Sequence, residues 1–449
     1  MKKTFDRRSF LSRSAVAGAG MIVIPRHVLG GKGYVAPSDK LNIAAIGSGG
    51  MGAGNINNVN SQNIVALCDV DFNRAAATFK KYPNAPQYKD YRVMLEKEKG
   101  IDAVIVATPD HSHAPAAMAA IKLGKHVYVQ KPLTHSVFEA RKLTEAVREY
   151  KVVSQMGNQG RSGEGTRRLA EWIWAGAIGE IREVHSWTNR PVWPQGIGRP
   201  AETMAVPGTL DWNLWLGTAP ERPYNSAYAP FNWRAWYDFG AGALGDMGCH
   251  VLDPVFHALK LKYPIWVQGS HSYEVTEMWK RVDNQETYPN TSMITYQFPA
   301  REKMPPVRLT WYDGGLMPTW PAEVDFSKIP ADGGSMFIGD KGIIVCSTYG
   351  GDVQMFPDER FLEYKDLPSS LKRIETSHEM NWVNACKGGE LPCSNFDYSG
   401  PLTEMVLMGN LAIRVPGKRL LWDGDNMKVT NDEDANRFIK REYRSGWTL

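Results

Sequence analysis

The sequence predicts an α/β protein, in which an N-terminal doubly wound parallel sheet is followed by a C-terminal α+β domain with a large, mainly antiparallel open sheet. Three observations support this fold class. A glycine-rich turn directly follows an apolar run near residue 46. Up to about residue 160, continuous apolar runs alternate with helical segments, which is typical of buried parallel strands. Beyond that point the strand-like runs alternate in polarity and follow one another in series, which favours antiparallel pairing.

The glycine-rich turn follows the apolar run Ile43–Ile46. We expect Gly47 to let the chain turn off the strand, Gly49 to let a pyrophosphate approach the backbone, and Gly52 to let a helix pack close to the sheet. The free N–H groups at the start of that helix would face the phosphates. The whole turn, predicted to bind a dinucleotide, reads Gly47-Ser48-Gly49-Gly50-Met51-Gly52.

Asp69 ends the next apolar run, twenty positions after Gly49. A carboxylate at this place accepts hydrogen bonds from a ribose and repels a 2′-phosphate. The sequence therefore favours NAD over NADP as the cofactor. The alternative is a glycine turn that serves only the fold.

The other elements of the first domain, residues 37–160, complete a Rossmann-type sheet. Thr108-Pro109 and Lys131-Pro132 each follow an apolar strand. Ligands of such sheets bind at the carboxyl ends of the strands, so both pairs should lie beside the glycine turn. The predicted strands are 101–109, 125–130 and 152–156, and the predicted helices are 110–124, which is capped by Asp110 and ends in Gly124, and 136–150.

Residues 161–449 form the predicted substrate-binding and oligomerisation domain, whose C-terminal segment can pack back on the first domain. Its tryptophan-rich stretch, 187–237, suits either stacking on a sugar or a core or subunit contact. A turn at Gly339–Gly342 resembles a hairpin. The predicted strands are 181–188, 265–274, 292–298, 307–312, 335–338 and 342–346, and the predicted helices are 166–175, 376–387 and 399–413.

Residues 1–36 are predicted to be an export signal and linker. The stretch Asp6-Arg7-Arg8-Ser9-Phe10-Leu11, followed by the apolar segment Ala15–Ile24, is similar to a twin-arginine signal. That export machinery carries folded proteins, often with their cofactor, so the expected location is the periplasm. No cysteine precedes Cys68 to carry a lipid anchor. The alternative is a disordered basic terminus.

Composition excludes several classes of function. The 52 basic and 48 acidic residues among 449 nearly balance, and no basic block suggests a nucleic-acid partner. No apolar run approaches the length of a membrane span. The five cysteines form no CxxC motif, so we interpret them as buried thiols rather than as a disulfide framework or a zinc site.

The chain resembles the Gfo/Idh/MocA family of sugar-type oxidoreductases over nearly everything after the signal. The family's usual Glu-Lys-Pro is Gln130-Lys131-Pro132 here. The resemblance implies a catalytic set of Lys131, Asp246 and His250, and a dimer or tetramer. The motifs that carry it are the glycine turn, Thr108-Pro109 with His113, Gly124-Lys125-His126-Val127 leading to Lys131-Pro132, and Asp246-Met-Gly-Cys-His250.

Each residue of this set also has a physical rationale. Lys131, at the cofactor edge, can hydrogen-bond a substrate hydroxyl near the nicotinamide; its alternative is a solvated lysine. Asp246 and His250 are four apart and would share a helix face, so that Asp246 orients or charge-stabilises a general base. The alternative is an Asp cap and a packed histidine.

Two histidine groups raise the question of a metal. Asp253 and His257 could extend the same helix face and permit a divalent ion, but we predict no metal site. His111 and His113 begin a helix, which favours capping and packing roles.

Polar and aromatic residues near the expected cleft are candidates for binding. Asn158 follows the last strand of the first domain and is predicted to contact the cofactor. A surface role is the alternative for any one of them. The predicted substrate-binding residues are Gln159, Arg161, Asn189, Arg190 and Trp193, together with Lys131, Asp246 and His250.

These features predict an exported oxidoreductase that transfers hydride from a hydroxyl of a sugar or glycoside to a tightly held NAD. Because the periplasm has no ready NAD pool, a dissociating cofactor would be lost. One alternative is an NAD-dependent glycosidase that uses transient oxidation, elimination and reduction, which needs a further base. The other is a non-catalytic sugar-binding protein.

Overall fold

A computed structural model describes residues 39–282 and 284–449, so the expected export signal lies outside the described residues. The first domain is built on a six-stranded sheet of order β3-β2-β1-β4-β5-β6 in which every pair is parallel. This confirms the predicted doubly wound sheet. Its strands are β1 (Asn42–Ile46), β2 (Asn63–Cys68), β3 (Gln87–Tyr88), β4 (Ala103–Val106), β5 (His126–Val129) and β6 (Ser154–Met156).

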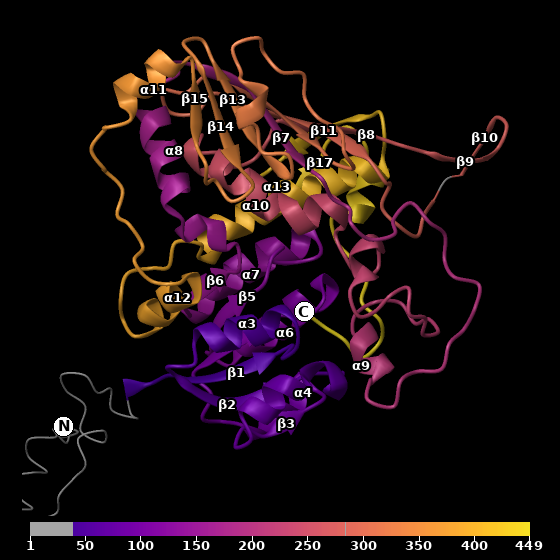
Figure 1. Cartoon of the computed structure of the whole chain (residues 1–449). Coiled ribbons are helices and arrows are strands. Elements are labelled where there is room, and N and C mark those ends of the chain that lie inside the picture. The colour runs from indigo at the N-terminus through magenta and orange to yellow at the C-terminus, as the bar shows by residue number, and fades with distance from the viewer. Residues whose placement is uncertain (1–38, 283) are drawn as a thin grey trace, which may run out of the picture. The chain divides into compact units, whose positions relative to one another are not determined.

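Helices connect these strands (Figure 1). The last begins at a capping box, in which the Ser136 side chain and Glu139 satisfy each other's backbone N–H groups. The start of the predicted helix 110–124 differs from the prediction. The Asp110 carboxylate accepts a hydrogen bond from the backbone N–H of Ala241 instead of capping its own helix. The elements are α3 (Met51–Asn58), α4 (Phe72–Lys81), α5 (Tyr91–Lys97), the 3₁₀ turn η2 (Asp110–Ser112), α6 (His113–Lys122) and α7 (Val137–Tyr150).

The second domain contains a nine-stranded sheet of order β15-β14-β13-β7-β12-β11-β8-β16-β17. Among the described residues β7 and β12 are its one parallel pair, so the predicted mainly antiparallel sheet is confirmed. The strands are β7 (Ile181–Thr188), β8 (Trp266–His271), β11 (Ser292–Phe298), β12 (Val307–Tyr312), β13 (Gly333–Gly339), β14 (Ile343–Ser347), β15 (Gln354–Phe356), β16 (Arg419–Asp423) and β17 (Lys428–Val429).

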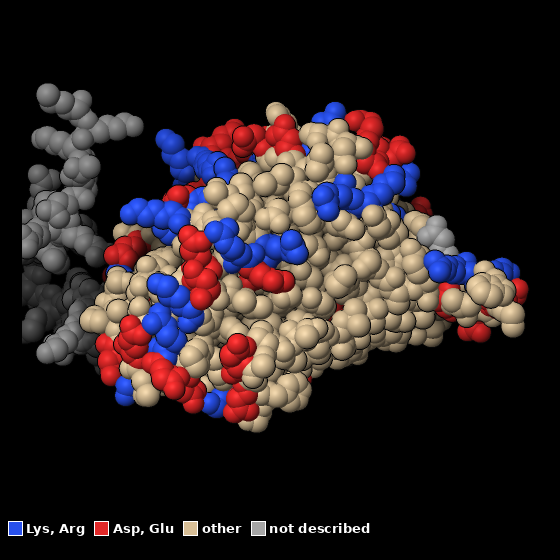
Figure 2. Space-filling view, turned by 90° about the horizontal axis from the view of Figure 1, so that it is seen from above, with Lys and Arg blue, Asp and Glu red and all other residues tan. Residues whose placement is uncertain are grey.

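One predicted strand, 265–274, is divided. After β8 the chain leaves the sheet and forms a separate hairpin of β9 (Glu274–Glu277) and β10 (Lys280–Val282). The hairpin projects from the sheet in Figures 1 and 2. Its tip carries Met278 and Trp279, whose exposed fractions are 86% and 95%.

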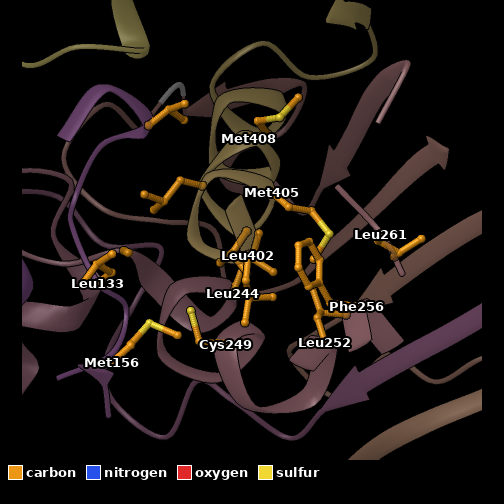
Figure 3. Packing of buried hydrophobic residues seen from close by; sticks show 14 of the residues in the cluster. Leu133, Met156, Leu244, Cys249, Leu252, Phe256, Leu261, Leu402, Met405 and Met408 are labelled. Atoms are coloured by element: carbon orange, nitrogen blue, oxygen red, sulfur yellow. The ribbon is translucent and has the colours of Figure 1, made fainter. Parts of the chain in front are cut away.

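Two long helices cover one face of the nine-stranded sheet. They are α10 (Gly242–Ala258) and α13 (Phe396–Arg414), and α13 also packs along α7 of the first domain. Figure 3 shows their contact, where Leu244, Cys249, Leu252 and Phe256 of α10 meet Leu402 and Met405 of α13. A continuous buried cluster thus joins both domains. The other helical elements are η3 (Gln159–Ser162), α8 (Glu164–Trp174), α9 (Trp212–Leu216), η4 (Asn232–Ala235), η5 (Phe326–Lys328), α11 (Asp358–Tyr364), α12 (His378–Cys386) and η6 (Asp434–Phe438).

No long helix of the described residues covers the opposite face of the sheet. Seen from above in Figure 2, charged side chains lie across the left and upper parts of the view, and a broad uncharged area extends toward the projecting hairpin. No helix of the described residues is long and apolar enough to cross a bilayer.

The six tryptophans of the tryptophan-rich segment are all buried. Trp212 stacks on Trp215 with ring centroids 4.6 Å apart, and Phe239 packs edge-on against Trp215. These rings belong to a buried cluster, separate from the main core, that also packs against Val70 at the end of β2. The other tryptophans of this cluster are Trp193, Trp233 and Trp236.

The C-terminal segment returns to the first domain. The backbone N–H of Phe138 donates to Ile439 O at 3.0 Å, and Tyr443 Oη donates to Glu139 Oε1 at 2.5 Å. α12 adds a buried hydrogen bond from Asn55 Nδ2 to Glu379 Oε1 at 2.8 Å.

The cysteines of the described residues form no disulfide. Cys68, Cys249 and Cys346 are buried, as expected, whereas Cys386 and Cys393 are partly exposed.

Candidate active site

A cavity of about 450 Å³ lies at the carboxyl ends of the parallel strands. It is here that the structure brings together most of the predicted cofactor-binding residues: Gly47, Gly49, Gly50, Met51, Asp69, Thr108, Pro109, His113 and Lys131. Three others do not line this cavity. Ser48 and Gly52 are buried behind the turn, and Asn158 is buried where its Oδ1 accepts a hydrogen bond from Ser394 Oγ at 2.5 Å.

The glycine turn has the geometry of a dinucleotide cradle. Gly47 has φ +85°, and a Cβ on it would lie 2.5 Å from Ala107 O. A Cβ on Gly52 would collide with Gly47 O, so the close helix packing that we predicted does require glycine there. α3 begins at Met51 with no side-chain cap, and although Gly52 N donates to Gly49 O at 3.0 Å, the start of the helix can still face an anion. These observations fit a bound pyrophosphate.

Gly49 has a further reason to be glycine. A Cβ there would lie 2.7 Å from Arg74 Cγ, and the guanidinium of Arg74 lies close beside Gly50. Arg74 also lines the cavity, so it is a cation in position to meet a phosphate. Sequence reasoning missed it, although it stands one turn into the helix that follows Asp69.

Asp69 lies at the carboxyl end of β2, as predicted, and also holds the glycine turn. Its Oδ2 accepts from the backbone N–H groups of Ser48 at 2.8 Å and Gly49 at 3.1 Å, and its Oδ1 accepts from Asp71 N at 2.9 Å. Burial raises the pKa of this carboxyl, although the three backbone N–H groups lower it. Oδ2 already accepts two hydrogen bonds and Oδ1 accepts one, so Oδ1 keeps a lone pair that can accept from a ribose hydroxyl.

Lys131, which lines the cavity, forms an ion pair with Asp246. Lys131 Nζ donates to Asp246 Oδ1 at 3.0 Å and to Asp246 O at 2.6 Å. Arg234 Nε donates to the same Oδ1 at 3.0 Å. These two cations outweigh burial and hold the pKa of Asp246 well below its usual range.

The predicted arrangement, in which Asp246 orients His250, is therefore replaced in the structure by contacts of Asp246 with two cations. Both residues lie on α10, but the hydrogen bonds of Asp246 go to Lys131 and Arg234, which reach it from other segments. His250 Nδ1 is buried and has no hydrogen-bond partner among the described residues. Its ring meets Tyr349 edge-on, with centroids 4.9 Å apart.

The protonation of His250 follows from its surroundings. Burial, reinforced by the charge of Lys131, lowers the pKa of His250 well below its ordinary value, against a smaller opposing effect of Asp246. The imidazole is therefore neutral at neutral pH and has a nitrogen able to accept a proton. This suits a general base.

Two residues of the turn after β4 complete the cavity. His113 contacts Thr108 O and Pro132 O, each at 2.8 Å, and so joins the ends of β4 and β5. Asp110 is buried, and burial raises its pKa to about 7 against the opposing charges of Arg234 and Lys131. From the sequence we predicted Asp110 only as a helix cap and not as a site residue, although it directly follows Thr108-Pro109.

A second cavity, of about 430 Å³, contains two of the predicted substrate-binding residues. Asn189 Nδ2 donates to Asp332 Oδ1 at 2.8 Å, and Arg190 Nη1 donates to Asn189 Oδ1 at 2.5 Å. The cavity adjoins α10, because its lining includes Met247 of that helix and also Tyr349, the ring that contacts His250. Nothing in the sequence around Tyr349 indicated this position.

The structure places three other predicted substrate-binding residues elsewhere. Trp193 is buried in the aromatic cluster and donates to Gln195 Oε1. Arg161 is buried against His257 Nδ1 at 3.0 Å and over the Tyr398 ring. Gln159 is exposed and lines neither cavity. Distant segments supply the partners of Arg161, so the local sequence could not show its burial.

The helix face that could have carried a metal has other partners. Tyr398 Oη donates to Asp253 Oδ1 at 2.6 Å, and His257 contacts Arg161. His111 contacts two backbone carbonyls, Phe239 O and Trp215 O. Among residues 39–282 and 284–449, no group of three or more His, Cys, Asp or Glu side chains is arranged to hold a metal ion.

Two family models match the chain. Residues 41–158 match the model of an oxidoreductase family with an NAD-binding Rossmann fold, and residues 182–297 match the C-terminal alpha/beta domain of an oxidoreductase family. Together they account for slightly more than half of the chain.

Curated relatives match over part of their length. Inositol 2-dehydrogenase of Salmonella typhimurium is 30% identical over 151 residues, which are 32% of this chain and 45% of the relative. D-glucoside 3-dehydrogenase of Escherichia coli is 26% identical over 226 residues, which are 49% and 55% of the two chains. The chain thus spans about half the length of the curated relatives that it matches.

Solved structures share the fold. The WlbA dehydrogenase from Bordetella pertussis, in complex with NADH and UDP-GlcNAcA, aligns with a TM-score of 0.57 at 16% identity over 86% of this chain and 99% of that one. An aldose-aldose oxidoreductase from Caulobacter crescentus, complexed with glycerol, aligns with a TM-score of 0.54 at 15% identity over 85% and 100%.

Proposed function

Because the chain belongs to the Gfo/Idh/MocA family of oxidoreductases, whose NAD-binding and C-terminal domains it contains, we propose that it oxidises a hydroxyl of a sugar or glycoside by hydride transfer to NAD. One observation carries this proposal. Lys131 lies in the cofactor cavity and pairs with Asp246, one helical turn from a buried histidine that has an unpartnered nitrogen.

The side chains divide the work as follows. Lys131 Nζ donates a hydrogen bond to the substrate oxygen and stabilises the negative charge that develops there as the carbonyl forms. Asp246 holds Lys131 in place through two contacts. The neutral imidazole of His250 takes the hydroxyl proton as the C–H bond breaks. Bound NAD supplies the hydride acceptor at its nicotinamide C4.

The curated relatives support a polyol or sugar as the substrate class, since their names are those of inositol and glucoside dehydrogenases. The second cavity, with Asn189, Arg190, Asp332 and Asp352 in its lining, offers both donors and acceptors for hydroxyl groups. We assign the substrate to this cavity, next to His250.

The twin-arginine pattern supports export to the periplasm, and export implies a cofactor that stays bound through many turnovers. A second sugar or a separate acceptor would then reoxidise the NADH in place. We also propose that the chain forms a homo-oligomer, as the family resemblance implies.

A redox-neutral glycosidase is the second candidate, and Asp110 favours it. Such an enzyme needs a base for the C–H next to the transient carbonyl. Asp110 lines the same cavity as Lys131, and its pKa of about 7 suits proton abstraction near neutral pH.

The deciding experiment uses protein purified from the periplasm without added nucleotide. Any dinucleotide released on denaturation is identified, and the native protein is incubated with a panel of glycosides. Bound NAD that becomes NADH without release of the aglycone supports the dehydrogenase. Release of the aglycone without net NADH supports the glycosidase, and absence of bound nucleotide contradicts the retained cofactor.

A further inference from the structure

The cofactor cavity has a second wall, which comes from the C-terminal domain. Opposite the glycine turn and Asp69, its lining includes Pro207, Leu210, Leu214 and Trp215. We call residues 207–215 the strap. It runs from a loop into α9, which lies beside the first domain near α4 in Figure 1.

The strap is fastened to the chain two residues beyond Asp69. Asp211 N donates to Val70 O at 2.9 Å, and Phe72 N donates to Thr209 O at 3.2 Å. Between these bonds Asp71 and Leu210 form an isolated antiparallel pair. Thr209 Oγ1 adds a hydrogen bond to Asp71 Oδ1 at 3.1 Å.

The other end of the strap is anchored in the protein interior. Trp212 and Trp215 of α9 are buried in the aromatic cluster. From the C-terminal segment, Arg444 donates to Asn213 Oδ1 at 2.7 Å and to Asn213 O at 2.8 Å. Trp447, under the Arg92 guanidinium at 4.4 Å, adds a further aromatic side chain to the cavity.

We propose that the strap closes over the adenosine half of bound NAD and controls the rate at which the cofactor leaves. This rests on the proposed function, in which the chain binds NAD, with the ribose at Asp69 as the sequence predicts. Because the strap joins the chain immediately after Asp69, a dinucleotide seated there lies between the glycine turn and the strap. It cannot leave on that side until the Asp71–Leu210 contact opens.

The construction of the contact suits a gate. An isolated pair with two main-chain hydrogen bonds has none of the neighbouring ladder that protects a strand within a sheet, so it opens more readily. The anchored α9 limits how far the strap can move. Slow exchange of cofactor, rather than none, is the expected behaviour.

The test is a reversible cross-link, Asp71→Cys with Leu210→Cys. The flanking hydrogen bonds make these two residues a non-hydrogen-bonded pair, in which side chains approach most closely, within reach of a disulfide. The variant is loaded with NADH, and release is followed by the loss of bound-NADH fluorescence when a scavenging dehydrogenase and its substrate are added. The oxidised form should release NADH at least about ten times more slowly than the same protein reduced.

Each state of the double variant is the control for the other, since both lack the same two side chains. The single variants show whether native cysteines form other disulfides. A cross-link in the distant hairpin, Glu274→Cys with Val282→Cys, should leave release unchanged. Equal release rates in the oxidised and reduced forms of the Asp71→Cys/Leu210→Cys variant would overturn the gate.

A second variant does not depend on a disulfide. Leu214→Ala removes apolar surface of the strap that lines the cavity and should accelerate NADH release by at least about threefold, while Leu391→Ala, at an exposed site, should not. Unchanged release from Leu214→Ala would count against the strap. If wild-type protein is purified without nucleotide, cofactor retention fails, yet the cross-link on NADH-loaded protein still tests the gate.

Discussion

Lys131 and Arg234 share one oxygen of the Asp246 carboxylate, so the charge of Lys131 is balanced without any contact to the cofactor turn. Replacement of Lys131 by Met should therefore leave NAD binding intact. Loss of the hydrogen bond to the substrate oxygen should lower kcat/KM by about 10³-fold, as removal of such donors does. Turnover and bound nucleotide are measured together, with the exposed Lys142→Met as control. Survival of turnover in the Lys131→Met variant would refute the mechanism.

His250 determines the acidic side of the pH profile. Its pKa is lowered by burial, so the imidazole stays neutral and competent down to a pH well below its ordinary value near 6.5. We expect kcat/KM to stay level through pH 6.5 and to fall only at lower pH, when His250 becomes protonated. His250→Gln should lower activity and abolish the fall of kcat/KM at low pH. A wild-type profile that falls with a midpoint at or above 6.5 would contradict the assignment.

Asp69 has two functions that one pair of variants separates. Asp69→Asn keeps an oxygen for the backbone N–H groups of Ser48 and Gly49 but removes the charge that repels a 2′-phosphate. It should relax the preference for NAD over NADP. Asp69→Ala should in addition weaken the binding of both, because the glycine turn loses its support. The dissociation constants of NADH and NADPH, measured by fluorescence titration, test both expectations. An unchanged preference for NAD over NADP in both variants would show that Asp69 is not part of the ribose site.

Residues whose role is set by neighbouring sequence could be predicted, and residues whose partners are distant could not. Gly47, Asp69 and Lys131 follow strands directly, so the strand pattern alone places them at one edge of the sheet. Arg234 and Tyr349 reach Asp246 and His250 through contacts that form only when separate segments of the second domain fold against α10.

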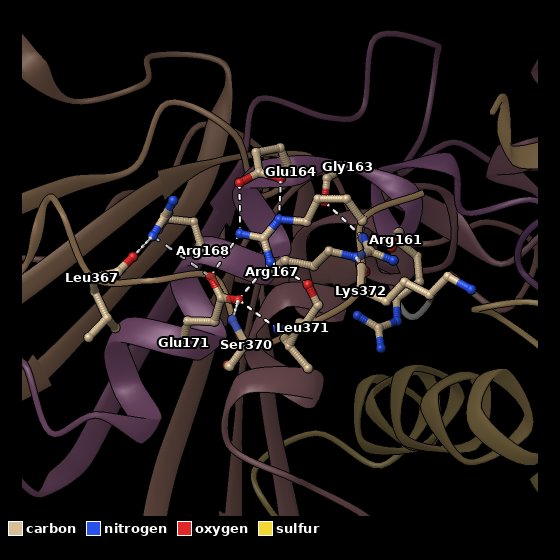
Figure 4. A network of polar contacts seen from close by, with 11 residues as sticks. Arg161, Gly163, Glu164, Arg167, Arg168, Glu171, Leu367, Ser370, Leu371 and Lys372 are labelled. Carbon is tan, nitrogen blue, oxygen red and sulfur yellow. Dashed lines mark hydrogen bonds and ion pairs between the residues drawn. The ribbon is translucent and has the colours of Figure 1, made fainter. Parts of the chain in front are cut away.

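At the level of elements, the buried carboxylate of Glu171, on α8, binds the connection formed by residues 367–373 (Figure 4). Glu171 accepts from the backbone N–H groups of Ser370 and Leu371, at 2.7 and 2.8 Å, and from two nitrogens of Arg373. Arg168 and Arg167 add bonds to Leu367 O and Lys372 O. The connection 367–373 thus depends on α8 for its order.

Glu171→Gln should destabilise the fold by about 2 kcal/mol, because Arg373 and two backbone N–H groups lose their charged acceptor, although Arg373 keeps Glu164 as a second partner. The hydrogen bonds of Arg373 lower the pKa of Glu171 to about 2. Its stabilisation is complete above the unfolded pKa near 4.5 and is lost as pH falls from there toward 2. Urea unfolding at pH 7 and pH 3 measures both effects. Glu363→Gln, at an exposed pair, is the control, and an equal loss in the two variants would contradict the argument.

The element boundaries show where local sequence patterns are enough to predict a strand or helix and where they are not. The strands at 292–298 and 307–312 occur as predicted, since they alternate clearly and lie within the sheet. The prediction of one strand over 265–274 was wrong, because the end of this stretch pairs in a separate hairpin rather than with β11. The 3₁₀ start of helix 110–124 depends on Ala241, which no local pattern could reveal.

At the level of the whole molecule, the two domains are interlocked rather than joined by a hinge. α13 packs on both the nine-stranded sheet and α7, and α12 and the C-terminal segment return to the first domain. The strap adds a contact at the end of β2. Cofactor exchange by wide opening of the domains would disrupt this shared core, which leaves local movement of the strap as the smaller change.

No residue of the strands β9 and β10 is buried in the core. Exposed apolar side chains of this kind mark contact sites, and the proposed homo-oligomer supplies a partner for Met278 and Trp279. The double variant Met278→Ser/Trp279→Ser should therefore lower the molar mass measured by light scattering toward that of one chain, with little change in melting temperature. Leu391→Ser, which removes another exposed apolar side chain elsewhere, should leave the assembly unchanged. If the double variant keeps the wild-type mass, the hairpin is not part of the interface.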